Sequence, residues 1–196
     1  RDGEAASFLA SGQNVRPTRL LEAGFRFVKP TIEDFFEGTD HAAVDRLDLH
    51  RYMGTWYEIA RFDHRFERGL SEVTATYTLM PDGTVRVENR GCKHKKPYDV
   101  CKTAEGRAKI PDPSQPGKLK VSFFLSFYSD YYVLELDQDE YNYALIGSSS
   151  DKYLWILSRV PILPEEIKKK LLDAATRRGY DVRKLIWVEQ REKKIM

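Results

Sequence analysis

The chain has 196 residues, of which 41% are hydrophobic and 32% charged, as expected for a globular protein with a sizeable core. Its 32 basic and 30 acidic side chains give a formal net charge of +2, so nucleic acid is not expected as a partner. The sequence has no run of about 18 apolar residues, which excludes a bilayer-spanning helix. Aromatic residues make up 12% of the chain, enough to line a cavity as well as to fill a core.

Residues 1–45 show neither a helical nor a strand period. Short apolar clusters in this region, around residues 25–28 and 32–36, are rich in phenylalanine. Because a free linker does not need so many aromatic side chains, we expect an N-terminal extension that packs on the rest of the chain or on a partner. Residues 46–196 are predicted to form the folded domain.

Alternating strand patterns fill most of this domain. Val73, Ala75 and Tyr77 alternate with threonines, which is typical of a strand with one buried face, and residues 81–83 predict a tight hairpin turn. The patterns cover residues 56–62, 73–79, 84–89, 103–110, 118–127, 131–136, 141–147 and 153–159. Eight short strands joined by short loops predict an all-β fold, an up-and-down antiparallel β-barrel whose interior holds one small ligand.

The end of the chain changes to a helical period. Pro164 suits a first helical turn and Gly179 suits a stop. The apolar positions of one helical face are Ile167, Leu171, Leu172 and Ala175. Residues 184–189 are predicted as a short final strand, so the barrel should carry one α-helix packed outside it.

The two cysteines, Cys92 and Cys101, enclose a polar segment that contains a proline, as a surface loop should. One interpretation is a local disulfide that ties two neighbouring strands in an exported protein. A second is two unrelated thiols, and a third is a metal site with His94, for which a fourth ligand is not evident.

Three separated motifs resemble the lipocalin family. Gly54-Thr55-Trp56 matches the GxW motif at the first strand, residues 129–131 match the second motif loosely, and Arg159 matches the third after the last strand. Residues 54–69 are similar to the bacterial outer-membrane lipocalins almost throughout, and apolipoprotein D is an animal relative of that branch. The similarity covers roughly residues 45–190 and implies the lipocalin calyx as the fold.

The resemblance also implies roles for individual residues. Trp56 would close the barrel floor, with Gly54 beside it and Arg159 packed across the ring. Trp155 and Tyr77 would line the ligand pocket. Further candidate wall residues are Val73 and Ala75, which share the face of Tyr77, together with Phe123, Leu125, Leu134 and Tyr143. Calyx residues and ordinary core residues look alike in sequence, so a purely structural role stays open for each of them.

The function that the resemblance implies is binding of a small hydrophobic ligand, for transport or storage, with a fatty acid or a lysophospholipid as first candidates. Basic residues near the open end could attract the head group, or form an ordinary solvated loop: Arg61, His64, Arg65 and Arg68. The implied location is the periplasm or outer membrane of a bacterium, after export with a leader that this sequence does not contain. Peripheral or lipid-anchored membrane association and a homodimer stay open.

Catalytic patterns are sparse in the sequence. The four histidines are scattered, and neither an HExxH motif nor a GxSxG motif is present. We therefore expect no enzyme activity, no cofactor and no metal. Two alternatives remain: a protein-interaction module that uses residues 1–45, and a thiol-dependent isomerase.

Overall fold

The structure is a computed structural model that describes residues 38–94, 98–124 and 127–191. Most of the predicted N-terminal extension and the candidate wall residue Leu125 lie outside these residues. The described end of the extension runs along the barrel, because Asp40 N donates to Arg178 O at 2.8 Å and Val44 N donates to Val133 O at 2.8 Å.

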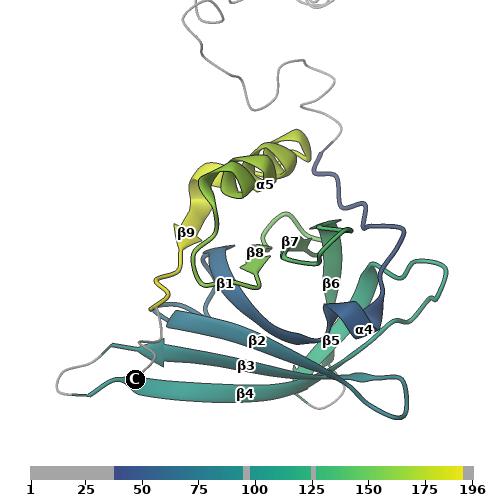
Figure 1. Cartoon of the computed structure of the whole chain (residues 1–196), viewed down its shortest axis with the longest axis horizontal. Helices are drawn as coiled ribbons and strands as arrows, with labels where there is room; N and C mark the ends of the chain where they lie inside the picture. The colour runs from purple at the N-terminus through teal and green to yellow at the C-terminus, as the bar shows by residue number, and fades with distance from the viewer. Residues whose placement is uncertain (1–37, 95–97, 125–126, 192–196) are drawn as a thin grey trace, which may run out of the picture.

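Eight antiparallel strands form a closed barrel (Figure 1). Each strand pairs with the next along the chain, and β1 closes the barrel by pairing with both β2 and β8. The strands are β1 (Gly54–Phe62), β2 (Ser71–Leu79), β3 (Val85–Lys93), β4 (Val100–Lys109), β5 (Lys118–Phe124), β6 (Phe127–Leu136), β7 (Tyr143–Gly147) and β8 (Leu154–Ser158). The predicted up-and-down eight-stranded barrel is confirmed.

The extent of the fifth strand was wrong in the prediction. The alternating pattern continues through residues 118–127, but β5 ends at Phe124 and β6 begins at Phe127, which pairs back onto Phe124. The polar residues Ser129 and Asp130 interrupt the apolar pattern inside β6, and Asp130 forms an ion pair with Lys120 of β5 at 2.6 Å. Because this polar pair interrupts the apolar pattern, the sequence did not indicate where β6 begins.

A short helix, α4 (Leu49–Tyr52), lies before β1 at one end of the barrel, and α5 (Glu165–Arg177) packs against the outer wall (Figure 1). In α5, acidic residues occupy the first turn and Arg177 the last, as the helix dipole favours. Its buried residues Leu171, Ala174 and Ala175 face the barrel. Among the residues that the structure describes, none of the helices combines the length and the apolar character needed to cross a bilayer.

The buried side chains form two clusters on opposite sides of the barrel wall. The interior cluster fills the lower part of the barrel and contains Tyr52, Trp56, Tyr77, Val85, Val87, Ala108, Leu119, Val121, Val133, Leu136, Tyr141, Ala144, Ile146 and Leu157. The outer cluster lies between the wall and α5 and contains Ile59, Ala60, Phe62, Leu134, Leu145, Leu154, Ile156, Leu163, Leu171, Ala175 and Tyr180. Strands β6, β7 and β8 are therefore apolar on both faces.

The C-terminal segment (residues 185–191) follows a 3₁₀ turn, η1 (Val182–Lys184), and lies along the upper half of β1. Strand β9 (Leu185–Trp187) pairs with Ala60, Arg61 and Phe62 of β1. Beyond β9, the Gln190 side-chain amide donates to Glu58 O at 2.8 Å and to Val73 O at 2.9 Å. Because the pairing of β1 with β2 covers only residues 54–57 of β1, this segment bridges the two strands above that point.

Candidate functional site

Trp56 and Arg159 close the floor of the barrel. Trp56 is fully buried, and the Arg159 guanidinium carbon lies 3.8 Å from the centre of its ring. The backbone of Gly54 has a φ of +92°, a left-handed value that favours glycine, and a Cβ there would lie 3.4 Å from Arg159 Nη1. The guanidinium donates to the carbonyl oxygens of Arg51, Tyr52, Met53, Thr55 and Tyr141. Arg159 therefore ties the floor to α4.

Three tyrosines place a row of hydroxyl groups within the interior cluster. The hydroxyl of Tyr131 lies 2.7 Å from that of Tyr52 and 3.0 Å from that of Tyr77. Burial raises the pKa of each of these phenols well above its usual value, so all three stay protonated at neutral pH. Two hydrogen bonds use two of the three hydroxyl protons, which leaves one proton to donate elsewhere.

The inner face of β3 and β4 changes in character from the floor upward. Two pairs of residues lie near the floor: Val85 opposite Ala108, and Val87 opposite Gly106. All of them except Gly106 belong to the interior cluster. Because alternate residues share a face, the same wall continues upward through three more pairs. These are Asn89 with Ala104, Gly91 with Lys102, and Lys93 with Val100. The wall is therefore apolar at the bottom, polar in the middle and basic at the top.

Asn89 carries a polar atom without a partner on this wall. Its Oδ1 is buried, and no hydrogen-bond donor among the described residues reaches it. A buried acceptor of this kind costs about 1–3 kcal/mol unless something donates to it. The middle of the inner face therefore offers a hydrogen-bond acceptor.

Near the open end, Trp155 and Glu67 are joined by a hydrogen bond. Trp155 packs against the interior cluster, and its Nε1 donates to Glu67 Oε2 at 3.1 Å. His64 Nε2 lies 2.7 Å from the same carboxylate oxygen, and its ring meets the Trp155 ring edge to face. Burial opposes ionisation of Glu67, but the hydrogen bond and the charge of His64 outweigh it and lower the Glu67 pKa. The connection from β1 to β2 is thereby fastened to β8.

Glu58 and Arg61 are paired and buried on the inner side of β1, with 2.6 Å between Oε1 and Nη1. A β-bulge between Glu58 and Ala60 lets both side chains share a face although they are three residues apart. Burial, together with the charge of Glu67, raises the pKa of Glu58 to about 8 in spite of the neighbouring guanidinium. Arg61 also donates to the carbonyl oxygens of Glu67 and Leu70.

Sequence reasoning missed Glu58 and the tyrosines Tyr52 and Tyr131. Glu58 could have been found, because it is two residues from Trp56 on the same strand and so shares its inward face. Of the four basic residues expected to attract a head group, Arg61, His64 and Arg68 are engaged with carboxylates of this chain. Arg65 is the one without such a partner among the described residues.

Five of the predicted wall residues lie on the inner side of the barrel. Tyr77, Ala75 and Trp155 belong to the interior cluster or pack against it. Val73 is buried beside Gly91, where an added Cβ would come within 3.2 Å of its Cγ2. Phe123 covers Gly106, where an added Cβ would lie 2.8 Å from its ring. Their contact with a ligand stays a prediction, and Leu125 lies outside the described residues.

The predicted inward positions of Leu134 and Tyr143 are wrong. Leu134 belongs to the outer cluster, and Val133 is its inward neighbour. Tyr143 packs on the same outer cluster, and its hydroxyl accepts a hydrogen bond from Lys170 of α5 at 2.7 Å. Because α5 covers this part of the wall, apolar side chains on its outer face are as buried as those inside.

Cys92 and Cys101 are directly opposite in the β3–β4 ladder and form a disulfide, which confirms that prediction. The two alternatives, unrelated thiols and a metal site with His94, are wrong because both sulfur atoms are used in the bond. The disulfide lies near the tip of the hairpin that overhangs the open end of the barrel.

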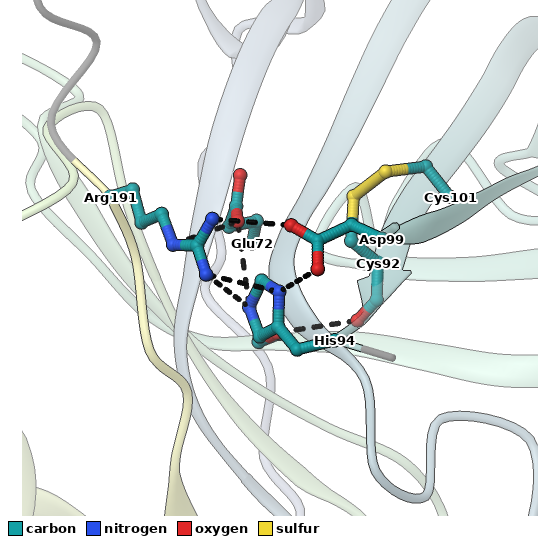
Figure 2. The surroundings of a disulfide bond; sticks show 7 residues. Glu72, Cys92, His94, Asp99, Cys101 and Arg191 are labelled. Carbon is teal, nitrogen blue, oxygen red and sulfur yellow. Dashed lines mark hydrogen bonds and ion pairs between the residues drawn. A yellow bond between two sulfur atoms is a disulfide. The ribbon is translucent and has the colours of Figure 1, made fainter. Parts of the chain in front are cut away.

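Figure 2 shows an ion-pair network beside this disulfide. His94 Nδ1 lies 2.9 Å from Asp99, and Arg191 Nη1 lies 3.2 Å from the same carboxylate. Glu72 Oε1 is 3.5 Å from His94 and 3.4 Å from Arg191. The hydrogen bond from His94 lowers the pKa of Asp99. Glu72, His94 and Asp99 have the spacing of metal ligands, but the Arg191 guanidinium supplies the positive charge, so the network ties the C-terminal segment to the hairpin.

Comparison with known proteins identifies the family. A family model described as a lipocalin-like domain matches residues 47–190. A model of a domain of unknown function, DUF1731, matches residues 3–38, almost all of which lie outside the described residues. Insecticyanin from the tobacco hornworm Manduca sexta superposes with a TM-score of 0.64 at 23% identity, over 79% of this chain and 87% of that one.

Several curated relatives are similar over most of their length. The chain is 50% identical to the outer membrane lipoprotein Blc of Escherichia coli (strain K12) over 147 residues, 75% of this chain and 81% of the relative. It is 42% identical to temperature-induced lipocalin-1 of Arabidopsis thaliana over 158 residues, 76% of this chain and 82% of the relative. Apolipoprotein D of Mus musculus is 34% identical over 154 residues, 74% and 78% of the two chains. With this fold and these matches, the chain belongs to the lipocalin family.

Proposed function

We propose that the barrel binds one small hydrophobic molecule with a polar head, and that this ligand is a fatty acid or a lysophospholipid. Lipocalins bind small hydrophobic ligands, and the observation that carries the finer proposal is the graded inner face of β3 and β4. An acyl chain inside the barrel, above the interior cluster, would leave water with a gain of about 25 cal/mol per Å² of apolar surface. Lys93 and Lys102 would meet a carboxylate or phosphate head.

The middle of the barrel supports the same orientation of the ligand. The acceptor atom Asn89 Oδ1 and the spare proton of the tyrosine row are polar groups that an amphiphile with hydroxyl or ester groups could satisfy. Trp155 adds a large aromatic surface near the open end, where the chain would meet the head group.

We infer that the protein binds its ligand without changing it chemically. The isomerase alternative requires a free thiol, and the two cysteines of the sequence are joined in the disulfide. The interaction-module alternative depends on residues 1–45, most of which lie outside the described residues, so it stays a prediction.

We infer an exported location, in the periplasm or outer membrane of a bacterium. Two relatives at 46–50% identity, from Vibrio cholerae and Escherichia coli, are named outer membrane lipoproteins. A disulfide between neighbouring strands also suits an oxidising compartment.

Native mass spectrometry followed by organic extraction tests the ligand class. Ala104 lies on the inner face of β4 and is exposed, so Ala104→Trp should fill the barrel at mid-height without crowding the interior cluster. The adjacent exposed residue Thr103 lies on the outer face, which makes Thr103→Trp the matched control. We expect the natural protein and the control to bind one fatty acid or lysophospholipid, and Ala104→Trp to weaken that affinity about tenfold or more. Equal affinities for the two variants, or refusal of both lipids by the natural protein, would contradict the proposal.

A further inference from the structure

We propose that the open end of the barrel is a docking surface for an anionic lipid bilayer. The open end is where β1, β3, β5 and β7 finish, because consecutive strands run in opposite directions. The floor with Trp56 and α4 is at the other end, where β1 begins. All features below belong to the open end and lie around the entrance to the barrel.

Exposed aromatic rings gather at this end. Phe66, in the connection from β1 to β2, is 70% exposed, and Tyr98, in the β3–β4 hairpin, is 81% exposed. Tyr128, at the start of β6, and Phe123, on the inner wall at the end of β5, are two further exposed rings at this end. Of the exposed rings in the described part of the chain, only Trp187 lies elsewhere, on β9 beneath the amine of Lys168. Such grouping of large apolar side chains at one end marks a surface that meets a partner.

Positive charge without a counterion surrounds these rings. The Arg65 guanidinium lies 4.6 Å from the Phe66 ring. Within the described ranges, Arg65, Lys93 and Lys102 have no carboxylate at ion-pair distance.

The carboxylates at this end are already neutralised by other groups. Asp63 pairs with Arg68 at 2.8 Å, and Asp99 pairs with His94 and Arg191. On the β7–β8 connection, Asp151 is followed directly by Lys152, so the two charges offset each other. The charge left over at the open end is therefore positive.

We favour a bilayer over a protein as the partner, because exposed aromatic rings with cations beside them are typical of residues at a bilayer surface. Rings of this kind lie at the level of lipid head groups, and lysine and arginine gain about 1 kcal/mol each, roughly fivefold in affinity, near an anionic surface. Contact through this end would bring the barrel entrance to the bilayer. An apolar ligand could then pass between membrane and barrel without crossing water. This inference does not depend on which ligand the barrel holds.

Flotation with large unilamellar vesicles tests the docking surface. The vesicles are pure phosphatidylcholine in one series and contain about a third of phosphatidylglycerol in the other, enough to make the surface anionic. We expect the full chain to bind the anionic vesicles, and the double variant Phe66→Ser with Tyr98→Ser to bind them about tenfold less or weaker still. Arg65→Gln should lose about fivefold on anionic vesicles and nothing on neutral ones.

The matched control is the double variant Val160→Ser with Ile162→Ser. Ile162 is 62% exposed, comparable to Phe66, but it lies in the connection from β8 to α5, away from the open end. The control should float like the natural chain. Equal losses in the two double variants, or no binding of the natural chain to either vesicle, would overturn the proposal.

Two further measurements separate this proposal from its rivals. If a second copy of the chain covers the rings, the mass in solution should be that of a dimer that Phe66→Ser with Tyr98→Ser dissociates, and the vesicle proposal fails. Ligand affinity is also measured for the flotation variants. A variant that no longer binds vesicles but still binds the ligand supports the docking surface. If Ala104→Trp loses ligand binding but still floats with the vesicles, ligand binding and membrane docking are independent of each other.

Discussion

The floor and the rim of the barrel both stack an arginine on an aromatic ring, but in opposite surroundings. At the floor, Arg159 lies 3.8 Å from a fully buried Trp56 and donates to the carbonyl oxygens of five residues. At the rim, Arg65 lies 4.6 Å from Phe66, whose ring is 70% exposed. Arg65 has no ion pair or hydrogen bond to the rest of the described chain.

The surroundings decide what such a pair does. Cation–π attraction is about 0.5–1 kcal/mol where water reaches the pair and about 2 kcal/mol where it is dry. A buried pair whose donors are all used holds the fold together, whereas an exposed pair contributes little to stability and stays available to a partner. Four changes test this contrast.

Trp56→Ala should have the largest effect. Removal of a fully buried indole leaves a cavity, and we expect the free energy of unfolding to fall by about 3–5 kcal/mol. Phe66→Ala, at the exposed ring, should change it by less than about 0.5 kcal/mol. Urea unfolding of both variants measures the difference. Similar values for the two would show that the floor is not the more stable end.

Arg159→Lys should come next. Lysine keeps the charge but cannot reach the carbonyl groups that the planar guanidinium satisfies, so we expect a loss of about 2 kcal/mol. The matched change at the rim, Arg65→Lys, should be neutral within about 0.5 kcal/mol. A neutral Arg159→Lys in urea unfolding would mean that charge alone, and not the hydrogen bonds, holds the floor.

Loss of the disulfide should weaken the rim and leave the floor intact. The bond joins residues nine apart in sequence, and a loop of this size contributes about 2 kcal/mol. Replacing Cys92 and Cys101 together by alanine should lower stability by that amount and increase amide exchange in the β3–β4 hairpin. Exchange in β1 next to Trp56 should not change. A reducing agent should have no further effect on this variant.

Glu58 should make stability depend on pH. Its pKa is about 8 in the folded chain against 4.5 when unfolded, so between these values the folded state keeps a proton that the unfolded state has lost. Stability should therefore fall as pH rises from about 4.5 to about 8, by at most about 1.4 kcal/mol per pH unit, and level off above. Glu58→Gln should flatten this part of the profile, and the exposed control Glu105→Gln should not. A profile that rises over the same range would contradict the assignment.

Much of the site could be predicted from the sequence, and the failures have a common cause. Tyr77 and Trp155, which the resemblance assigned to the pocket, lie on the inner side as expected. Leu134 and Tyr143 were misplaced because both faces of β6 and β7 are apolar where α5 covers them. Alternation identifies the inner face of a strand only where the outer face meets water.

The sequence by itself determined the number and order of the strands and the helix after them, and the motifs that carry the family resemblance indicated the two floor residues. These depend on local patterns: a period of two, a helix stop, and a motif before the first strand and after the last. Only the tertiary structure decided that Glu58 and Arg61 face inward together, because the β-bulge that brings them to one face depends on the pairing of β1 with β8. The basic upper wall of Lys93 and Lys102 and the bridge that the C-terminal segment makes from β1 to β2 also arise between segments far apart in the chain, where no local pattern records them.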